Sequence, residues 1–214
     1  MTDMHAPIIT EPSTVAADAL NRYLYGADPT ERIVAVERGG PDRMRVYRRV
    51  DGRVIEERVS FRPWLLMTQQ PAWADLTGDV RATRLAGDGE HCWFVECRNW
   101  NAFQDVRGRV RDAGDEPLLF TSPIQQYLTG SGRTLFKGMV YEDLLRMQLD
   151  IEATSLDPLV PHARIFLVSV RTSAGDERLF GAAGEDEATI FEDLTAFIRD
   201  VDPDVIEGHN IFNY

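Results

Sequence analysis

Hydrophobic and polar positions along the chain follow one pattern up to residues 138–146 and another beyond them. In the first part, a run with helical spacing ends at Gly26, which predicts a helix over Thr14–Tyr25. Three alternating segments follow, joined by Gly39-Gly40 and by Asp51-Gly52, and dipeptides of this kind favour hairpin turns. We therefore predict a small meander with the strands Arg32–Arg38, Arg43–Val50 and Arg53–Phe61.

The next segment predicts a βαββαβ unit. Its strands and helices are expected, in chain order, at Pro63–Thr68, Ala72–Leu76 (helix), Val80–Ala86, His91–Arg98, Trp100–Ala113 (helix) and Leu118–Thr121. This is the order of a ferredoxin-like fold. Together with the opening helix and the meander, it predicts an N-terminal domain over residues 1–140.

A sheet of this kind can bind single-stranded nucleic acid when aromatic and basic side chains are exposed on it. The candidates are Trp64, Trp93, Phe94, Arg62 and Arg98. Trp93 and Phe94 point to opposite faces of one predicted strand, so at least one belongs to the core. A structural role is the favoured interpretation, and direct contact with nucleic acid is the alternative.

The second part of the chain predicts a different sheet. Its elements are expected at Arg146–Ala153, Arg164–Thr172, Glu177–Gly181, Asp186–Val201 (helix) and Val205–Gly208. The first three of these strands form a second meander. A helix between this meander and the last strand allows the last strand to return parallel to the first strand of the second part. The fold class is therefore α+β or α/β, with a ferredoxin-like domain followed by a partial ribonuclease H-like mixed sheet over residues 141–214.

Two carboxylates, Asp150 and Glu152, lie two positions apart in the first of these strands. In a strand, that spacing places both on one face. Two such acids repel each other unless a cation lies between them. The spacing therefore predicts a metal site.

The charge distribution is consistent with cation binding. The net charge is −12, and residues 147–214 carry 14 acids against four arginines, whereas the preceding residues carry 21 acids against 19 basic residues. Negative charge near Asp150 raises the local concentration of divalent cations. No apolar run approaches the roughly 20 residues that cross a bilayer, and the first residues do not resemble a leader. We predict a cytoplasmic protein without membrane contact, in which Cys92 and Cys97 are unbridged packing residues.

Two segments of the second part carry a resemblance. Leu149-Asp150-Ile151-Glu152-Ala153-Thr154-Ser155 resembles the first exonuclease motif of family B DNA polymerases. Asp204-Val205-Ile206-Glu207-Gly208-His209-Asn210-Ile211-Phe212-Asn213-Tyr214 is similar to the second, whose usual form is a strand followed by Gly-Tyr/His-Asn, three variable residues, an aromatic residue and Asp. The N-terminal part also looks like the domain that precedes the exonuclease. The resemblance covers nearly the whole chain, with specific motifs only after Met147.

The resemblance implies a 3′-5′ exonuclease of the DEDD type, which hydrolyses phosphodiester bonds with two Mg²⁺ or Mn²⁺ ions about 4 Å apart. Asp150 and Glu152 would be the catalytic metal ligands. Asn210 and Thr154 would contact the substrate, which would be a single-stranded 3′ end of DNA.

The chain also departs from the family pattern. The aspartate of the second motif would follow Tyr214, and the third motif, Tyr-x-x-x-Asp on a helix, does not occur. Neither Asp157 nor Asp204 occupies the missing position. We therefore expect a fragment of a longer enzyme, with the remainder of a polymerase chain as its partner and no activity by itself. Two alternatives stay open: a non-catalytic nucleic-acid-binding or scaffolding module, and an acidic α+β protein whose motif match is due to chance.

Overall fold

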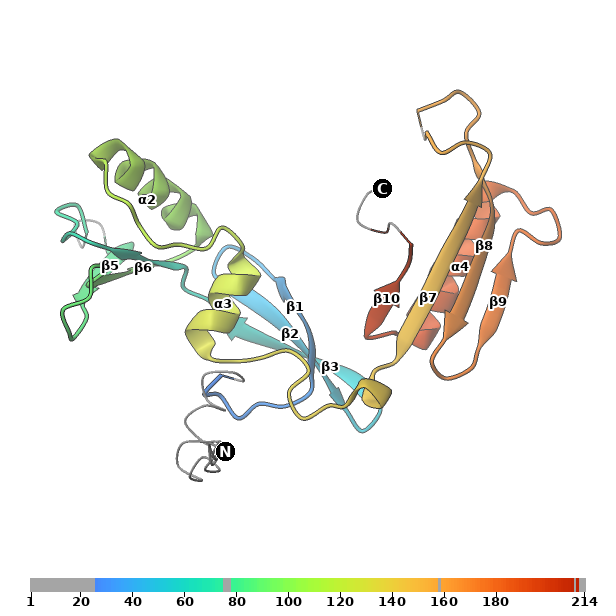
Figure 1. The fold of residues 1–214 in the computed structure, drawn as a ribbon, viewed down its shortest axis with the longest axis horizontal. Helices are drawn as coiled ribbons and strands as arrows, with labels where there is room; N and C mark the ends of the chain where they lie inside the picture. The colour runs from blue at the N-terminus through green and yellow to red at the C-terminus, as the bar shows by residue number, and fades with distance from the viewer. Residues whose placement is uncertain (1–25, 75–77, 158, 210, 212–214) are drawn as a thin grey trace, which may run out of the picture. The chain divides into compact units, whose positions relative to one another are not determined.

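The computed structural model describes residues 26–74, 78–157, 159–209 and 211 (Figure 1). The chain divides into two compact units, Met1–Lys137 and Gly138–Tyr214. The expected domain boundary, at residue 140, lies three residues after this division. The helix expected at Thr14–Tyr25 lies outside the described residues.

The meander of the first unit contains β1 (Ile33–Arg38), β2 (Arg43–Val50) and β3 (Arg53–Ser60), paired antiparallel in that order. Asp51 and Gly52 both have positive φ, at 50° and 76°. Two such residues form a turn whose twist matches that of the flanking strands. The local sequence at this turn therefore sets the β2–β3 register.

The second sheet of this unit contains β4 (Trp64–Met67), β5 (Val80–Arg84) and β6 (Trp93–Cys97), with β6 in the centre. Helix α2 (Trp100–Ala113) begins after Asn99, whose side chain accepts a hydrogen bond from the Ala102 backbone N–H. Apolar residues of α2 share one buried cluster with residues of the two sheets; its fully buried members include Ile33, Met44, Leu65, Val95 and Phe103.

Two expected elements of this unit differ in the structure. The strand expected at Leu118–Thr121 is wrong, since only Leu118 pairs with the sheet, through two backbone hydrogen bonds with Leu66 of 2.9 and 3.0 Å. The ladder ends there because the Phe120 carbonyl accepts a hydrogen bond from the Gln126 side chain instead. The helix expected at Ala72–Leu76 is wrong over its described residues, 72–74, which form a turn after Pro71.

Helix α3 (Pro123–Ser131) was not expected from the hydrophobic pattern. Its ends nevertheless carry ordinary signals: the Ser122 side chain caps the first turn, Pro123 follows, and Gly132 ends the helix in the left-handed region. Gln126 on this helix is fully buried. Its side chain accepts from the Trp64 backbone N–H at 2.9 Å and donates to the Phe120 carbonyl at 2.6 Å, which ties α3 to the edge of the sheet.

The second unit begins with a short 3-10 helix, η1 (Tyr141–Asp143), followed by β7 (Arg146–Ala153), β8 (Ile165–Thr172), β9 (Glu177–Phe180), α4 (Glu187–Val201) and β10 (Val205–Glu207). The strand order is β10-β7-β8-β9, with β10 parallel to β7 and the other pairs antiparallel. These strands and α4 match the expected ranges to within one residue at each end.

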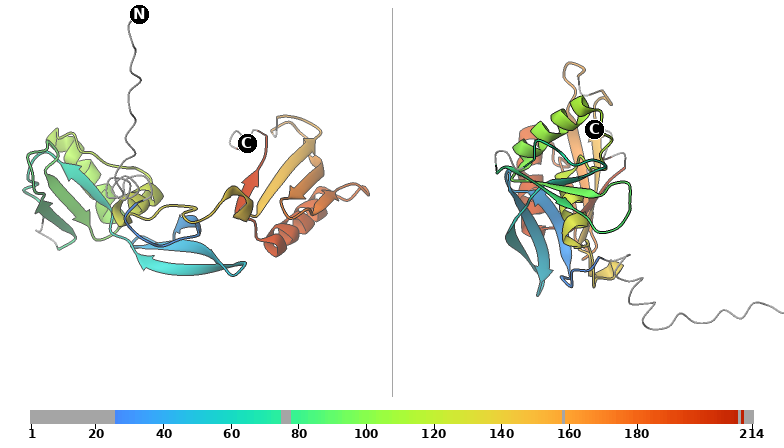
Figure 2. Two further views of the ribbon diagram at one scale, coloured as in Figure 1. Left: turned by 60° about the horizontal axis from the view of Figure 1, so that its bottom comes forward. Right: turned by 90° about the vertical axis from the view of Figure 1, so that its left-hand side faces the viewer.

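Helix α4 covers one face of this sheet, as the left view of Figure 2 shows. Its buried residues Ile190, Leu194 and Phe197 pack against Met147, Val168, Val170 and Phe180. The opposite face carries the alternate residues of each strand, and Leu179 there is 61% exposed. Among the described residues of this unit, no α-helix lies on that face. We call it the open face.

The buried amide of Gln126 gives a testable prediction about the first unit. Gln126→Leu keeps the volume but leaves the Trp64 N–H and the Phe120 carbonyl without their partner, so we expect a loss of about 2 kcal/mol or more in the free energy of unfolding. Urea denaturation followed by tryptophan fluorescence measures it. The matched control is Gln125→Leu, since Gln125 is exposed on the same helix. Equal stability of the two variants would contradict the assigned role.

The cap of α4 gives a prediction about pH. The Thr189 backbone N–H donates to the Asp186 carboxylate at 2.9 Å and lowers the pKa of Asp186 below its usual 3.8. Because the folded pKa is depressed, the charge stabilises the helix above the unfolded pKa, and this contribution disappears as pH falls through the folded pKa. Asp186→Asn keeps the cap without the charge. At pH 7 we expect this variant to be less stable than the unchanged chain, and we expect the difference to shrink below pH 3.8, where Asp186 becomes protonated. Urea unfolding at pH 7 and in acid measures the free energy of unfolding of both proteins.

Candidate functional site

Cross-strand register arranges the open face of the second unit in rows. Asp150 on β7 pairs with Ser169 on β8, which pairs with Leu179 on β9. The neighbouring row contains Glu207, Gln148, Arg171 and Glu177. Glu152 pairs with Leu167 on the other side of Asp150. The rows place an acidic pair next to polar and basic side chains on a surface that is open to solvent.

Asp150 and Glu152 project from the same face of β7. The neighbouring residues Met147 and Leu149 turn toward α4 and belong to, or pack against, its buried cluster. Both carboxylates are exposed. Among the described residues, no arginine, lysine or histidine forms an ion pair with either one. The two acids are therefore available to a divalent cation from solvent.

A groove of about 950 Å³ lies over this face. It is lined by Gln148, Leu149, Asp150, Ser169, Val170, Arg171, Glu177, Arg178, Leu179, Glu207, Gly208 and His209. The end of β10 thus reaches the surface that carries Asp150. Gly208 fits tightly there, since a Cβ added to it would lie 3.0 Å from the Leu149 carbonyl oxygen.

The predicted substrate contacts have different outcomes. Asn210 lies outside the described residues. Thr154 follows the last residue of β7, where its backbone N–H donates to the Arg164 carbonyl at 2.9 Å and its hydroxyl accepts from the Arg164 N–H at 3.0 Å. Thr154 therefore closes the loop between β7 and β8, and its contact with substrate stays a prediction.

The two other acids near the motifs have local structural roles. Asp157 accepts a hydrogen bond from the Leu159 backbone N–H within its loop. Asp204 accepts from the Leu145 N–H at 2.9 Å, at the opposite end of β7 from Glu152. Leu145 precedes Asp150 by five residues, a separation of about 16 Å in a strand. Asp204 therefore lies too far from Asp150 to share a cation with it.

The described residues contain no group of three or more His, Cys, Asp or Glu side chains arranged to hold a metal ion. The donors at hand are the oxygens of Asp150 and Glu152, which suit a hard cation such as Mg²⁺ or Mn²⁺. Mg²⁺ commonly keeps several water ligands and binds through one or two carboxylates. These two residues therefore fit one weakly held ion.

Glu207 and Arg146 belong to this surface but were not singled out in the sequence. Arg146 Nη1 lies 3.1 and 3.3 Å from the two carboxylate oxygens of Glu207. Only the parallel pairing of β7 with β10 brings these residues together, from positions 61 apart in sequence.

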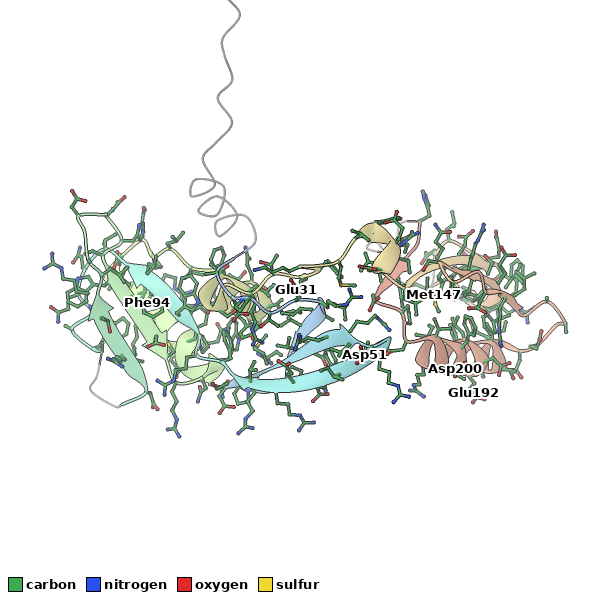
Figure 3. All side chains as sticks on the ribbon, turned by 90° about the horizontal axis from the view of Figure 1, so that it is seen from below. Glu31, Asp51, Phe94, Met147, Glu192 and Asp200 are labelled. Carbon is green, nitrogen blue, oxygen red and sulfur yellow. The ribbon has the colours of Figure 1, made fainter. Side chains whose placement is uncertain are left out.

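Figure 3 labels Met147 on β7, and Glu192 and Asp200 on α4, whose exposed side lies away from the open face.

The aromatic candidates of the first unit are largely taken up by packing. Trp64 is 9% exposed, and its Nε1 donates to the Gln126 carbonyl at 3.1 Å. Trp93 packs against the buried cluster. Phe94, labelled in Figure 3, is half-buried, and its ring centroid lies 5.8 Å from that of Trp64. Arg98 pairs with Asp79 at 3.3 Å, and Arg62 is exposed.

The cysteines contribute no chemistry to the candidate site. Both are free, and Cys97 lies in the core of the first unit. Burial raises the pKa of Cys97 to about 12, so its sulfur stays protonated at neutral pH. Within the described residues, no helix has the length and apolar character needed to span a membrane.

The fold of this chain is similar to part of a solved structure. No protein-family model matches the chain, and no curated protein matches its sequence. The family B DNA polymerase of the hyperthermophilic archaeon Pyrobaculum calidifontis has a similar structure, with a TM-score of 0.61 and 21% sequence identity over 84% of this chain. The matched region is 30% of that polymerase. This chain therefore has an α+β fold that is also found in part of a family B DNA polymerase.

Proposed function

We propose that this chain is part of a family B polymerase-like 3′-5′ exonuclease, with the candidate site in its second unit. The observation that carries the proposal is the placement of Asp150 and Glu152 on one open face, with Asp150 in the groove that the Gly208–His209 segment also lines. Both segments come from the two sequence motifs that resemble the exonuclease motifs of that family.

The strand orders support the same interpretation. In the second unit, a three-stranded meander, a helix and a parallel strand beside β7 correspond to the opening half of a ribonuclease H-like sheet. In the first unit, the bridge at Leu118 extends the order β4-β6-β5 on the β4 side. With that bridge as a fourth strand, the order is that of a ferredoxin-like sheet.

The proposed chemistry assigns each residue one task. Asp150 and Glu152 would contribute ligands to divalent ions, Mg²⁺ or Mn²⁺, which in the complete enzyme would activate water and stabilise the leaving oxygen. Asn210 and Thr154 contact the terminal nucleotide. The substrate is a single-stranded 3′ end of DNA, because unpaired bases can spread over an open surface. The remainder of a polymerase chain is the proposed partner.

A second candidate function is a non-catalytic nucleic-acid-binding or scaffolding module. The observation that favours it is the lack, within the described part of the chain, of a third ligand arranged with Asp150 and Glu152. Two-metal hydrolysis needs more ligands than these two carboxylates provide. Metal binding separates both candidates from a chance match, and release of mononucleotides that depends on Asp150 would be compatible only with the exonuclease.

Metal binding gives the first test. We expect the chain to bind Mn²⁺ and Asp150→Asn to bind it about tenfold or more weakly, since the substitution removes one of two anionic ligands. Electron paramagnetic resonance of free Mn²⁺ measures the affinity. Asp200→Asn on the exposed side of α4 is the matched control and should bind as the unchanged chain does. Equal affinity of Asp150→Asn and the control would count against the proposed site.

Hydrolysis gives the second test. We expect the 214-residue chain alone to release no mononucleotides from 3′-labelled single-stranded DNA in Mg²⁺ or Mn²⁺, because its described residues hold an incomplete ligand set. Gel electrophoresis of the labelled products measures the reaction. Robust release that disappears in Asp150→Ala would overturn this expectation and would establish that the chain is sufficient for catalysis.

A further inference from the structure

Strand β10 contains only three residues, although it leads into the segment that lines the groove. Only three register pairs hold it to β7: Val205 with Arg146, Ile206 with Met147, and Glu207 with Gln148. Parallel ladders are slightly less stable per residue than antiparallel ones. The same strand carries Gly208 and His209 to the groove of Asp150. Side-chain contacts must therefore help to fix its position.

Polar contacts occur at both ends of β10. At its start, the Asp204 carboxylate accepts from the Leu145 N–H at 2.9 Å, and the Asp204 N–H donates to the Leu145 carbonyl at 2.7 Å. At its end, Arg146 Nη1 contacts both carboxylate oxygens of Glu207. The Gln148 amide lies 3.5 Å from one of them. The two ends of the strand are thus attached to β7 independently.

The Arg146–Glu207 pair is better shielded than the other ion pair on the open face. Its side chains are 22% and 33% exposed, whereas those of Arg171 and Glu177 are 68% and 67% exposed. The Arg146 guanidinium also lies over the Tyr141 ring, 4.1 Å from its centroid. A stacked and half-buried guanidinium loses less freedom on pairing than an exposed one. The pair therefore contributes more than a surface salt bridge, which is worth little.

The ion pair and the Asp204 contacts together select one register. A slip of one residue would turn Glu207 toward the apolar face under α4, because side chains alternate along a strand. A slip of two residues in one direction would place Glu207 opposite Asp150, which carries a like charge, and the slip in the other direction would break the contacts of Asp204 with Leu145. In the observed register, Gly208 lies against the Leu149 carbonyl, one residue before Asp150. Correct pairing of Glu207 and correct placement of Gly208 therefore occur together.

We infer that Arg146 and Glu207 are positioning residues, which lock the register of β10 and so hold the Gly208–His209 segment beside Asp150. The role of this ion pair in catalysis rests on the proposed function, whereas its effect on the register of β10 does not. Glu207 acts through the strand and is not a metal ligand, because its charge is paired with Arg146. The sequence motifs do not assign a role to either residue.

Hydrogen exchange tests, without any metal, whether the ion pair fixes the register of β10. In Arg146→Met, which keeps an unbranched side chain over Tyr141 without the charge, we expect amide exchange of Ile206, Glu207 and Gly208 to be about tenfold faster by NMR. Glu207→Gln should behave similarly. The charge-swapped double variant Arg146→Glu with Glu207→Arg should restore slow exchange. Arg98→Met, which breaks the exposed pair with Asp79 in the first unit, is the control. Unchanged exchange in Arg146→Met overturns the inference.

Paramagnetic broadening by Mn²⁺ tests the positioning role. In the unchanged chain, Mn²⁺ should broaden the amide signals of Asp150, Gly208 and His209 together. In Arg146→Met it should still broaden Asp150 but broaden Gly208 and His209 less than in the unchanged chain, and the charge-swapped variant should regain the original pattern. Broadening of Gly208 and His209 in Arg146→Met that is as strong as in the unchanged chain overturns the positioning role. If the unchanged chain shows no broadening at Asp150, that result counts against the proposed function alone. Hydrogen exchange then tests by itself whether the ion pair fixes the register of β10.

Discussion

The one-sided packing of α4 is the constraint on which the candidate site depends. Ile190, Leu194 and Phe197 bury one face of the β10-β7-β8-β9 sheet, so every second residue of β7 must turn inward. Met147 and Leu149 occupy those positions, and Asp150 and Glu152 consequently face solvent. A carboxylate on the inner face would lose its hydration without a partner, which makes the other orientation of β7 costly.

The parallel strand β10 adds the second half of the site. A parallel neighbour of β7 requires a crossover, and α4 supplies it while it buries the inner face. The helix therefore both orients the carboxylates and returns the chain to them. Ion pairing of Arg146 with Glu207, with the backbone contacts of Asp204, fixes where the returning strand stops. Packing sets the face and polar contacts set the register.

Local sequence signals predicted most of the strands, because alternation, turn dipeptides and helix caps act over a few residues. They failed around Gln126, whose buried side chain binds the Phe120 carbonyl and the Trp64 backbone N–H. Leu118–Thr121 has the composition of a strand, but the Phe120 carbonyl bonds to Gln126 and the ladder ends after Leu118. The hydrophobic pattern does not predict helix α3, although Ser122, Pro123 and Gly132 mark its ends, because the buried Gln126 interrupts its apolar periodicity.

For the candidate site, the spacing of Asp150 and Glu152 was enough to place both on one face of a strand, because that spacing has only one geometry in extended backbone. The sequence also determined the helix that precedes Val205 and the turn at Asp51-Gly52. Tertiary structure alone decided that the face is open, that Thr154 closes the adjoining loop, and that Arg146 pairs with Glu207. These features depend on which segments pack together across tens of residues, and local propensities carry no information about such distances.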